Sequence, residues 1–402
     1  MPTTQTQNTT TPTLRFPWFS DWWEEKKLGE ISKIYDWTHS TPNYVEKWIP
    51  FYSVEHVTAN QFKNTRYISE SVFNKENERV KLEKWDILMT RIWDIWTSRL
   101  IDWNVKASFY VSLALIKQNN KFNSWFLNQY IKSNFLQKEL WSRTIHVAFP
   151  KKINLWEIWK CSLSLPSLPE QEKIASFLTT VDEKIEKIRE KKGLLEEYKK
   201  GLMQRLFYPP LKGDTGGSKK DYLRFPGFSD EWEEKKLGDL VNIRNNQRKP
   251  ITSNLRNNWK YPYYWATWII DYVDWYIFDE KLLLVWEDWA KRWKNEESAF
   301  IAEGQYWVNN HAHVLETKEN YDIFFLMTLL NYINLKKYST WNAPAKLTLD
   351  NLKKLKINLP SLSEQEKIAN FLSTIDEKIE KIDSELVEVE SWKKGLLQRL
   401  FV

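Results

Sequence analysis

The feature that most constrains the fold of this chain is an internal repeat. Two sequence blocks occur in each half of its 402 residues. The first block, LRFPWFSD at 14–21, recurs as LRFPGFSD at 223–230, and WEEKKLG follows each copy after one residue. The second block, LPSLPEQEKIASFLTTVDEKIEKI at 165–188, recurs as LPSLSEQEKIANFLSTIDEKIEKI at 359–382. Self-similarity on this scale indicates duplicated structural units, so we expect two copies of one arrangement, each a variable segment followed by a constant one.

The second block predicts two long helices. Ser167 with Glu170, and Ser361 with Glu364, have the spacing of a capping box at a helix start. Beyond these caps, apolar residues recur at alternating steps of four and three, as in a coiled-coil seam. The predicted seam comprises Ile174, Leu178, Val181, Ile185, Ile188, Leu195, Tyr198 and Leu202, and in the second copy Ile368, Leu372, Ile375, Ile379, Ile382, Leu386, Val389 and Leu396.

Apolar stripes of this length need a partner, because they outlast a typical globular helix. Two stripes in one chain predict an antiparallel coiled coil with an approximate twofold relation between the halves. Two alternatives stay open: each helix packs on its own domain, or the helices pair between chains. We expect an α+β protein with a polar disordered tail at 1–13, mixed α/β domains at 14–165 and 223–358, long helices at 166–207 and 359–402, and a Pro/Gly/Ser-rich linker at 208–222.

Composition excludes several protein classes. Hydrophobic residues make up 42% and charged residues 28%, as in folded soluble proteins. The sequence has no run of about 18 apolar residues and no signal-peptide pattern at its start, so we expect a cytoplasmic protein without a membrane partner. A single cysteine, Cys161, excludes an internal disulfide framework and a multi-cysteine metal site, and is expected to be a small buried hydrophobe. The net charge of +6 is compatible with a polyanionic partner.

Glycine is scarce and tryptophan abundant, with 10 and 24 residues respectively. No glycine occurs between Gly29 and Gly193, although turns with positive φ normally use it. Trp18 in the first repeat stands opposite Gly227 in the second. Our hypothesis is that UGA codons of the source encode glycine, so that tryptophan stands here at some native glycine positions. The alternative is a genuinely tryptophan-rich protein.

The duplicated blocks resemble those of the specificity subunits of type I restriction-modification enzymes. Further points of resemblance are FYSVEHV at 51–57 and DILMTR at 86–91. The resemblance covers nearly the whole chain and implies two target recognition domains separated by two conserved helices. It also implies that each domain reads one half of an asymmetric bipartite site in double-stranded DNA. The expected partners are two methyltransferase subunits and the endonuclease/translocase subunits, and these partners, not this chain, would use S-adenosylmethionine, ATP and Mg²⁺.

The sequence predicts no catalytic site. It contains no Asn-Pro-Pro-Tyr or Asp-Pro-Pro-Tyr segment, no phosphate-binding loop and no HExxH zinc motif. DNA recognition needs basic groups for phosphates and polar groups for base edges, on exposed loops. The candidates for DNA contact are Tyr35, Asp36, Thr38, His39, Arg91 and Arg99 in the first domain, and Arg244, Asn245, Asn246, Arg248, Lys249, Lys291, Arg292 and His311 in the second.

Each of these residues, taken singly, also fits an ordinary solvated surface. Two other functions remain as alternatives. One is an orphan DNA-binding adaptor without partner enzymes, and the other is an enzyme with an unrecognised nuclease site.

Overall fold

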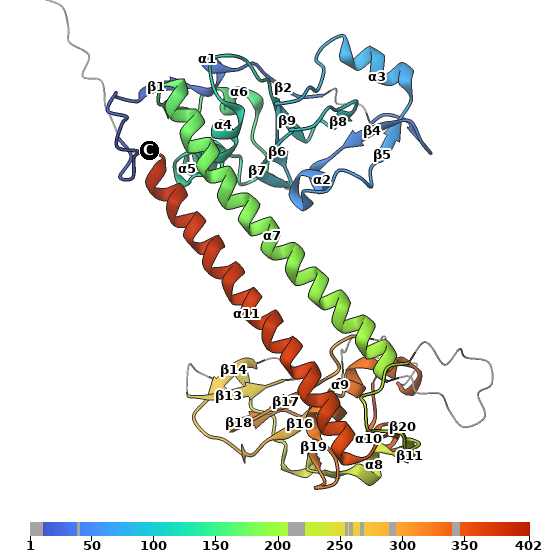
Figure 1. The fold of residues 1–402 in the computed structure, drawn as a ribbon. Helices are drawn as coiled ribbons and strands as arrows, with labels where there is room; N and C mark the ends of the chain where they lie inside the picture. The colour runs from blue at the N-terminus through green and yellow to red at the C-terminus, as the bar shows by residue number, and fades with distance from the viewer. Residues whose placement is uncertain are drawn as a thin grey trace, which may run out of the picture. The chain divides into compact units, whose positions relative to one another are not determined.

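The structure is a computed structural model that describes residues 11–37, 41–207, 222–253, 256, 260–265, 269–288, 295–339 and 346–402. Packing divides the chain into two compact units. Unit 1 consists of Met1–Arg189 with Glu385–Val402, and unit 2 consists of Glu190–Ser384. Each unit therefore contains part of both long helices, α7 (Leu168–Leu206) and α11 (Leu362–Leu400) (Figure 1).

Unit 1 combines short helices with three small sheets. Its elements before α7 are β1 (Glu24–Lys27), α1 (Leu28–Ile31), β2 (Ile34–Tyr35), β3 (Tyr44–Val45), β4 (Ile49–Tyr52), α2 (Val54–Ala59), β5 (Arg66–Ile68), α3 (Glu70–Asn77), β6 (Ile87–Ile92), β7 (Asp94–Leu100), β8 (Ser108–Phe109), β9 (Leu113–Ile116), α4 (Ser124–Ile131), α5 (Asn134–Ser142), α6 (Leu155–Trp159) and β10 (Ser162–Leu165).

Unit 2 repeats this plan. Its elements before α11 are β11 (Glu233–Lys236), α8 (Leu237–Leu240), β12 (Val241–Ile243), the 3-10 turn η1 (Asn245–Gln247), β13 (Tyr261–Tyr264), β14 (Ile269–Val273), β15 (Phe278–Asp279), β16 (Leu282–Trp286), β17 (Ala299–Ala302), β18 (Gln305–Val308), β19 (Ala312–Thr317), α9 (Ile323–Tyr332), the 3-10 turn η3 (Leu335–Tyr338), α10 (Leu349–Lys353) and β20 (Lys356–Leu359).

The main sheets of the two units have equivalent strand orders. They are β2-β9-β6-β7 in unit 1 and β12-β19-β16-β17 in unit 2, and in both the central pair is antiparallel. A second four-stranded sheet contains one parallel pair, β4 with β8 in unit 1 and β13 with β18 in unit 2. A two-stranded sheet joins the first repeated block to the start of the long helix, as β1-β10 and β11-β20. The variable segments thus share a scaffold despite their dissimilar sequences.

The first repeated block is fastened to the helix start by a buried ion pair in each unit. Arg15 donates hydrogen bonds of 2.7 and 2.7 Å to the two carboxylate oxygens of Glu170, and Arg224 donates bonds of 2.8 and 2.8 Å to Glu364. Both glutamates are 1% exposed. The carboxylates predicted to cap their own helices therefore bind an arginine from the preceding block instead.

The glycine of the repeated KLG motif allows two short helices to approach closely. In unit 1 a β-carbon on Gly29 would lie 1.8 Å from the indole of Trp159 on α6, and in unit 2 one on Gly238 would lie 3.1 Å from the Cβ of Lys353 on α10. Larger residues at these positions would push α1 from α6 and α8 from α10.

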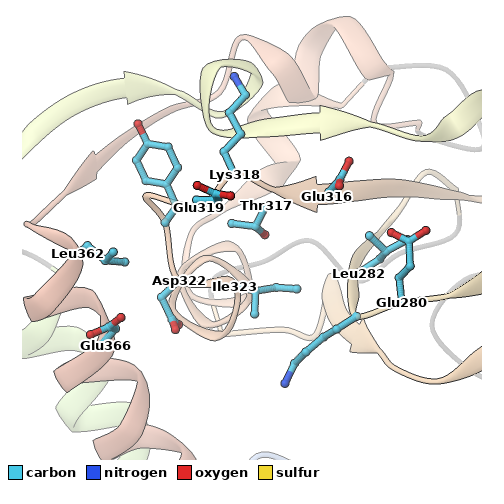
Figure 2. A pocket seen from close by; sticks show the side chains of 12 residues that line it. Glu280, Leu282, Glu316, Thr317, Lys318, Glu319, Asp322, Ile323, Leu362 and Glu366 are labelled. Atoms are coloured by element: carbon cyan, nitrogen blue, oxygen red, sulfur yellow. The ribbon is translucent and has the colours of Figure 1, made fainter.

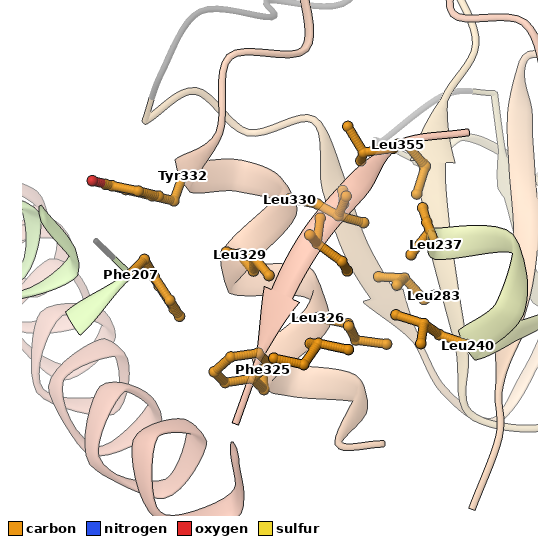
Figure 3. Packing of buried hydrophobic residues seen from close by; sticks show 14 of the residues in the cluster. Phe207, Leu237, Leu240, Leu283, Phe325, Leu326, Leu329, Leu330, Tyr332 and Leu355 are labelled. Atoms are coloured by element: carbon orange, nitrogen blue, oxygen red, sulfur yellow. The ribbon is translucent and has the colours of Figure 1, made fainter. Parts of the chain in front are cut away.

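The far end of each long helix completes the core of the unit that it reaches. At the end of α7, Phe207 packs in unit 2 with ring centroids 5.4 Å from those of Phe325 and Tyr332 on α9 (Figure 3). At the end of α11, Phe401 packs in unit 1 at 5.3 Å from Phe126 and 5.0 Å from Tyr130 on α4. The repeated QRLF ending thus supplies a core aromatic residue to each unit.

The long helices pair antiparallel within each unit, as predicted, and the pairing is within one chain. In unit 1 Asp182 pairs with Lys393, and Arg189 pairs with Glu390 at 2.5 Å. Most of the predicted seam is buried, the buried members being Ile174, Leu178, Val181, Ile185, Ile188, Leu202, Ile368, Leu372, Ile375, Ile382, Val389 and Leu396. Tyr198 is exposed, so the seam prediction was wrong at that position.

Unit 2 also contains two ion pairs between the long helices, and one of them matches a pair of unit 1. Lys192 and Lys199 of α7 pair with Asp383 and Asp376 of α11 at 2.7 and 2.5 Å. The sequence repeat makes Lys199–Asp376 the counterpart of Lys393–Asp182, which lies in unit 1. The same contact thus forms once in each unit.

Three tryptophans of unit 1 adopt left-handed backbone conformations. The φ angles of Trp85, Trp93 and Trp96 are 76°, 74° and 73°. Gly227 has a positive φ of 93°, whereas Trp18, which stands opposite it in the repeat, does not, so the support comes from Trp85, Trp93 and Trp96. These angles support the hypothesis that tryptophan replaces glycine in this sequence, because residues with a Cβ rarely adopt them.

A candidate nucleic-acid interface

In unit 2, most of the described candidate residues meet at one end of the main sheet. Three segments are joined there by backbone hydrogen bonds: Glu287 N–H donates to His311 at 2.9 Å, and Leu347 N–H donates to Glu287 at 2.9 Å. The chain after β12 lies alongside, because the side-chain oxygen of Asn245 accepts a 2.8 Å bond from Val314 N–H. Residues distant in the sequence therefore form one polar surface, which we call the sheet-end site.

Arg248 organises the centre of this site. It donates hydrogen bonds to the carboxylate of Glu287 at 3.0 Å and to the backbone oxygens of Asn310 and Ala312 at 3.1 and 2.7 Å. Its side chain is mostly buried, so it holds the loop before β19 in place. The rigid fork of a guanidinium suits several acceptors in fixed directions.

His311 lies in the loop before β19, between the two residues whose backbone oxygens Arg248 binds, and forms a polar pair with Asp288. The Nδ1 atom of His311 is 2.7 Å from an Asp288 oxygen, and the ammonium of Lys346 lies 3.1 Å from the other oxygen. Burial opposes the charge on Asp288, but its bonds to His311 and Lys346 outweigh this effect and hold its pKa below the ordinary value. An ionised Asp288 thus fixes the orientation of both basic side chains.

His313 is buried beneath the sheet-end site and contacts two of the segments that form it. Its Nε2 atom is 2.7 Å from the backbone oxygen of Leu347, and its Nδ1 atom is 3.0 Å from the amide nitrogen of Asn245. A neutral imidazole with its proton on Nε2 satisfies both contacts, because Nδ1 then accepts from the amide. Burial lowers the pKa of His313, which agrees with this tautomer.

The corresponding end of the main sheet in unit 1 is built around a buried ion pair. Arg91 at the end of β6 donates a 2.9 Å bond to Asp36, and its other bonds go to the backbone oxygens of Val111 and Ile153. Arg79 contacts the other oxygen of Asp36 at 3.1 Å. Asp36 and Arg91 are buried, so the prediction that they are exposed contact residues was wrong, and the structure gives both a packing role.

Two lysines that sequence analysis missed occupy matching positions in the two units. Ile153 N–H donates a 2.9 Å bond to Arg91, as Leu347 N–H does to Glu287, which makes the preceding residues, Lys152 and Lys346, equivalent. Each precedes a helix N-cap residue, Asn154 of α6 or Thr348 of α10. The signal was present in the sequence as PKKINL at 150–155 and PAKLTL at 344–349.

The remaining candidates are placed as follows. Asn246 and Lys249 are exposed beside Arg248, and Tyr35 is half-buried on β2. Arg244 turns away from the sheet-end site and binds Glu280 and Glu316 at 3.1 and 3.2 Å. Arg99 lies on β7, where its guanidinium donates to backbone oxygens of Ser98 and Thr58 at 3.3 Å each, and burial lowers its pKa. Thr38, His39, Lys291 and Arg292 lie outside the described residues.

The opposite end of the main sheet in unit 2 is acidic. A pocket of about 440 Å³ opens there between the start of β16, the end of β19 and the start of α9 (Figure 2). Its lining includes five carboxylates and two lysines, so the carboxylates are in excess: Glu280, Glu316, Glu319, Asp322 and Glu366, with Lys281 and Lys318. Such a lining repels phosphate, so a DNA backbone would approach unit 2 from another side.

Among the described residues, no three His, Cys, Asp or Glu side chains are placed to hold a metal ion together. Cys161 is buried, as expected, and burial raises the pKa of its thiol to about 12. Among the described helices, none combines the length and apolar character that crossing a membrane requires.

Known proteins resemble this chain over both repeats. The family model described as type I restriction modification DNA specificity domain matches residues 20–197 and again 229–391. A putative type I restriction enzyme specificity subunit of Haemophilus influenzae is 36% identical over 149 residues, which are 37% of this chain and 38% of that protein. The putative MjaX specificity subunit of Methanocaldococcus jannaschii is 28% identical over 302 residues, covering 72% and 70% of the two chains.

A solved structure shares the fold. The type I restriction-modification S subunit from M. genitalium aligns with a TM-score of 0.62 at 15% identity, over 98% of this chain and 99% of that one. Together with the two matches of the family model, this likeness confirms the expected mixed α/β architecture with two repeated recognition domains. The chain belongs to the specificity subunits of type I restriction-modification systems, which are their non-catalytic DNA-recognition components.

Proposed function

We propose that this chain binds an asymmetric, bipartite site in double-stranded DNA and that each unit reads one half of it. The observation that carries the proposal is the pair of equivalent lysines, Lys152 and Lys346. Each directly precedes a residue that makes the same backbone bond at the same end of the main sheet. The side chains around them differ between the units. One scaffold with two different surfaces suits two different half-sites.

The chemistry of the sheet-end site supports this proposal. Lysine ammonium groups bind phosphate oxygens and so position a protein on the duplex without reading its sequence. In unit 2 the exposed Asn246 lies beside Lys249, and an amide can pair with adenine in the major groove. The bonds that hold Arg248 and His311 fix their positions before DNA arrives, which lowers the entropic cost of binding.

We also propose the partners that family membership suggests. The chain would dock two methyltransferase subunits and the endonuclease/translocase subunits, with the long helices as the docking surface. S-adenosylmethionine, ATP and Mg²⁺ would then belong to those subunits. An orphan adaptor that binds DNA without partner enzymes is the alternative, and a search of neighbouring reading frames for a methyltransferase separates the two.

Sequencing of native DNA from the source, scored for adenine methylation, tests the proposal in the cell. A split motif of two different half-sites around a fixed gap is the expected result. The purified chain should bind duplexes that carry this motif more tightly than scrambled duplexes. Failure to discriminate between them would refute the proposed function.

Titration with salt tests the role of the two lysines in DNA binding. Lys152→Ala and Lys346→Ala should each weaken binding to motif and scrambled duplexes alike, and each should reduce the slope of log affinity against log salt by about 1. Lys191→Ala, at an exposed position on α7, is the matched control and should leave the slope unchanged. Equal slopes for the wild-type chain and the three variants would show that neither Lys152 nor Lys346 contacts DNA phosphates.

A further inference from the structure

The loop between α5 and α6 in unit 1 exposes two large apolar side chains at its tip. Val147 is 99% exposed and Phe149 is 92% exposed. At these exposures neither side chain buries appreciable apolar surface in the folded chain. Exposed apolar groups clustered in this way mark surfaces that bind something else.

The base of this loop is joined by backbone hydrogen bonds to the corresponding end of the main sheet in unit 1. Ile145 N–H donates a 2.8 Å bond to Lys152, and Lys152 forms an isolated bridge with Ile92 at the end of β6. Trp93 N–H donates a 3.2 Å bond to Lys151. The tip therefore projects from the sheet end that carries Lys152, and its base is held by the main sheet.

The charges beside the tip indicate its occupant. Lys151 and Lys152 follow Phe149 within three residues, and both are exposed. An apolar tip flanked by lysines is complementary to a duplex, in which phosphates border the apolar faces of the bases. Proteins that deform DNA insert phenylalanine and other apolar side chains between base steps in this way.

We propose that Phe149, supported by Val147, is a wedge that inserts between two base pairs of the half-site bound by unit 1, while Lys151 and Lys152 hold the adjacent phosphates. This inference rests on the proposed function, since it requires that unit 1 bind DNA. Opening a base step makes recognition depend on how easily that step unstacks, even where no side chain contacts a base edge.

Fluorescence of 2-aminopurine tests the wedge directly. Duplexes that the full chain enriches from a randomised library are prepared with 2-aminopurine at successive positions, and the chain is added without methyltransferase subunits, so that no base is flipped by them. The wild-type chain should raise the fluorescence at one step by several-fold, because the probe loses a stacking neighbour. The double variant Val147→Ala/Phe149→Ala should abolish this rise and weaken binding about tenfold, the usual effect of losing one aromatic–base stack.

Two controls accompany the double variant. Phe149→Leu should retain most of the fluorescence rise, because leucine also serves as a wedge. Val387→Ala, which changes an exposed valine on α11, should behave as wild type. Unfolding curves should be unchanged for all variants, since the altered side chains are exposed.

The remaining outcomes separate the wedge from the proposed function. Tight binding of an enriched duplex with no fluorescence rise at any position, or a rise that survives the double variant, would overturn the wedge and leave DNA recognition standing. A double variant that binds DNA normally but loses association with a protein subunit would reassign the tip as a protein interface and overturn the wedge too. If the library yields no enriched sequence, the proposed function fails, and the wedge fails with it.

Discussion

At the scale of single residues, the left-handed tryptophans are the least expected feature. A left-handed conformation costs a residue with a Cβ about 1–2 kcal/mol, because the Cβ crowds the following carbonyl oxygen. Burial does not offset this cost at Trp93, whose side chain is 62% exposed. Glycine adopts the same conformation without the steric cost. On the hypothesis that the source reads UGA codons as glycine, the conformation, the exposure and the shortage of glycine have one common cause.

We therefore predict that Trp93→Gly and Trp85→Gly each stabilise unit 1 by about 1 kcal/mol, because relief of the strained φ exceeds the added chain entropy of glycine. Urea unfolding measures the change. Trp23→Gly is the control and should destabilise by about 3–5 kcal/mol, because Trp23 is a core residue. Peptide masses of the protein from its source should show glycine at position 93, and tryptophan there would refute the reassignment.

His313 makes the stability of unit 2 depend on pH. Its pKa is lower in the folded protein than in the unfolded chain, so the unfolded state binds the proton more readily. Protonation would also place a second N–H donor against the amide group of Asn245. The stability that the neutral ring contributes is therefore present at pH 7 and is lost as pH falls through the unfolded-state pKa toward the lower folded-state value.

We predict that the free energy of unfolding of unit 2 falls between pH 7 and pH 5 and that His313→Gln removes part of this fall. Asn245→Asp should act in the same direction, since a carboxylate beside Nδ1 favours the protonated ring. Urea titrations at the two pH values, with hydrogen exchange to locate the change in unit 2, measure the effect. An unchanged pH dependence in both variants would show that His313 does not titrate in this range.

At the scale of elements, a buried bidentate ion pair joins the chain entry to the helix start in each unit. In a buried site each charged group of the pair satisfies the hydrogen bonds of the other. Removal of one group leaves the other buried with an uncompensated charge. Arg15 also donates a 2.5 Å bond to the backbone oxygen of Asp21, and Arg224 donates an equal bond to that of Asp230. The arginine thereby closes the FPxFSD turn onto the helix.

We predict that Arg15→Ala destabilises unit 1 by about 3–5 kcal/mol, because it leaves Glu170 ionised and buried without its partner. Arg224→Ala is the matched change and should have a similar effect in unit 2. The double variant Arg15→Met/Glu170→Met should recover most of the loss, since no buried charge remains. Chemical denaturation measures the free energy of unfolding of all three variants. If the double variant lost as much stability as the single changes at Arg15 and Glu170 added together, the two side chains would not be energetically coupled.

At the scale of the whole molecule, the sequence repeat and the packing unit are different divisions of the chain. Unit 1 consists of Met1–Arg189 together with Glu385–Val402 from the other end of the sequence. Leu14 N–H donates a 2.9 Å bond to Arg399 of α11, and in unit 2 Leu223 N–H donates a 2.9 Å bond to Arg205 of α7. Neither half of the sequence repeat contains all the residues of one unit, so an isolated half lacks part of the core of its unit.

We predict that Phe401→Ala destabilises unit 1 by about 3–5 kcal/mol, the usual cost of removing a buried aromatic ring. Hydrogen exchange should accelerate in α4, which Phe401 contacts, although the two are far apart in sequence. Phe207→Ala should instead accelerate exchange in α9 of unit 2. Faster exchange confined to the end of α11 in the first variant would contradict this account.

The sequence by itself determined the duplication, the two long helices, most of their seam and the family. These features repeat locally at fixed spacings, and spacing is readable without a structure. It also exposed the shortage of glycine, which the φ angles of Trp85, Trp93 and Trp96 now connect to particular turns.

The tertiary structure alone decided which candidate side chains are exposed. Arg91, Arg244 and Arg248 have the same chemistry in the sequence. In the structure Arg91 is buried on Asp36, Arg244 binds Glu280 and Glu316 away from the sheet-end site, and Arg248 lies at the centre of that site. The equivalence of Lys152 and Lys346 likewise emerged from strand register and backbone bonds. Burial and long-range pairing arise from contacts between distant segments, so a local pattern such as PKKINL or PAKLTL does not show by itself where its lysine lies.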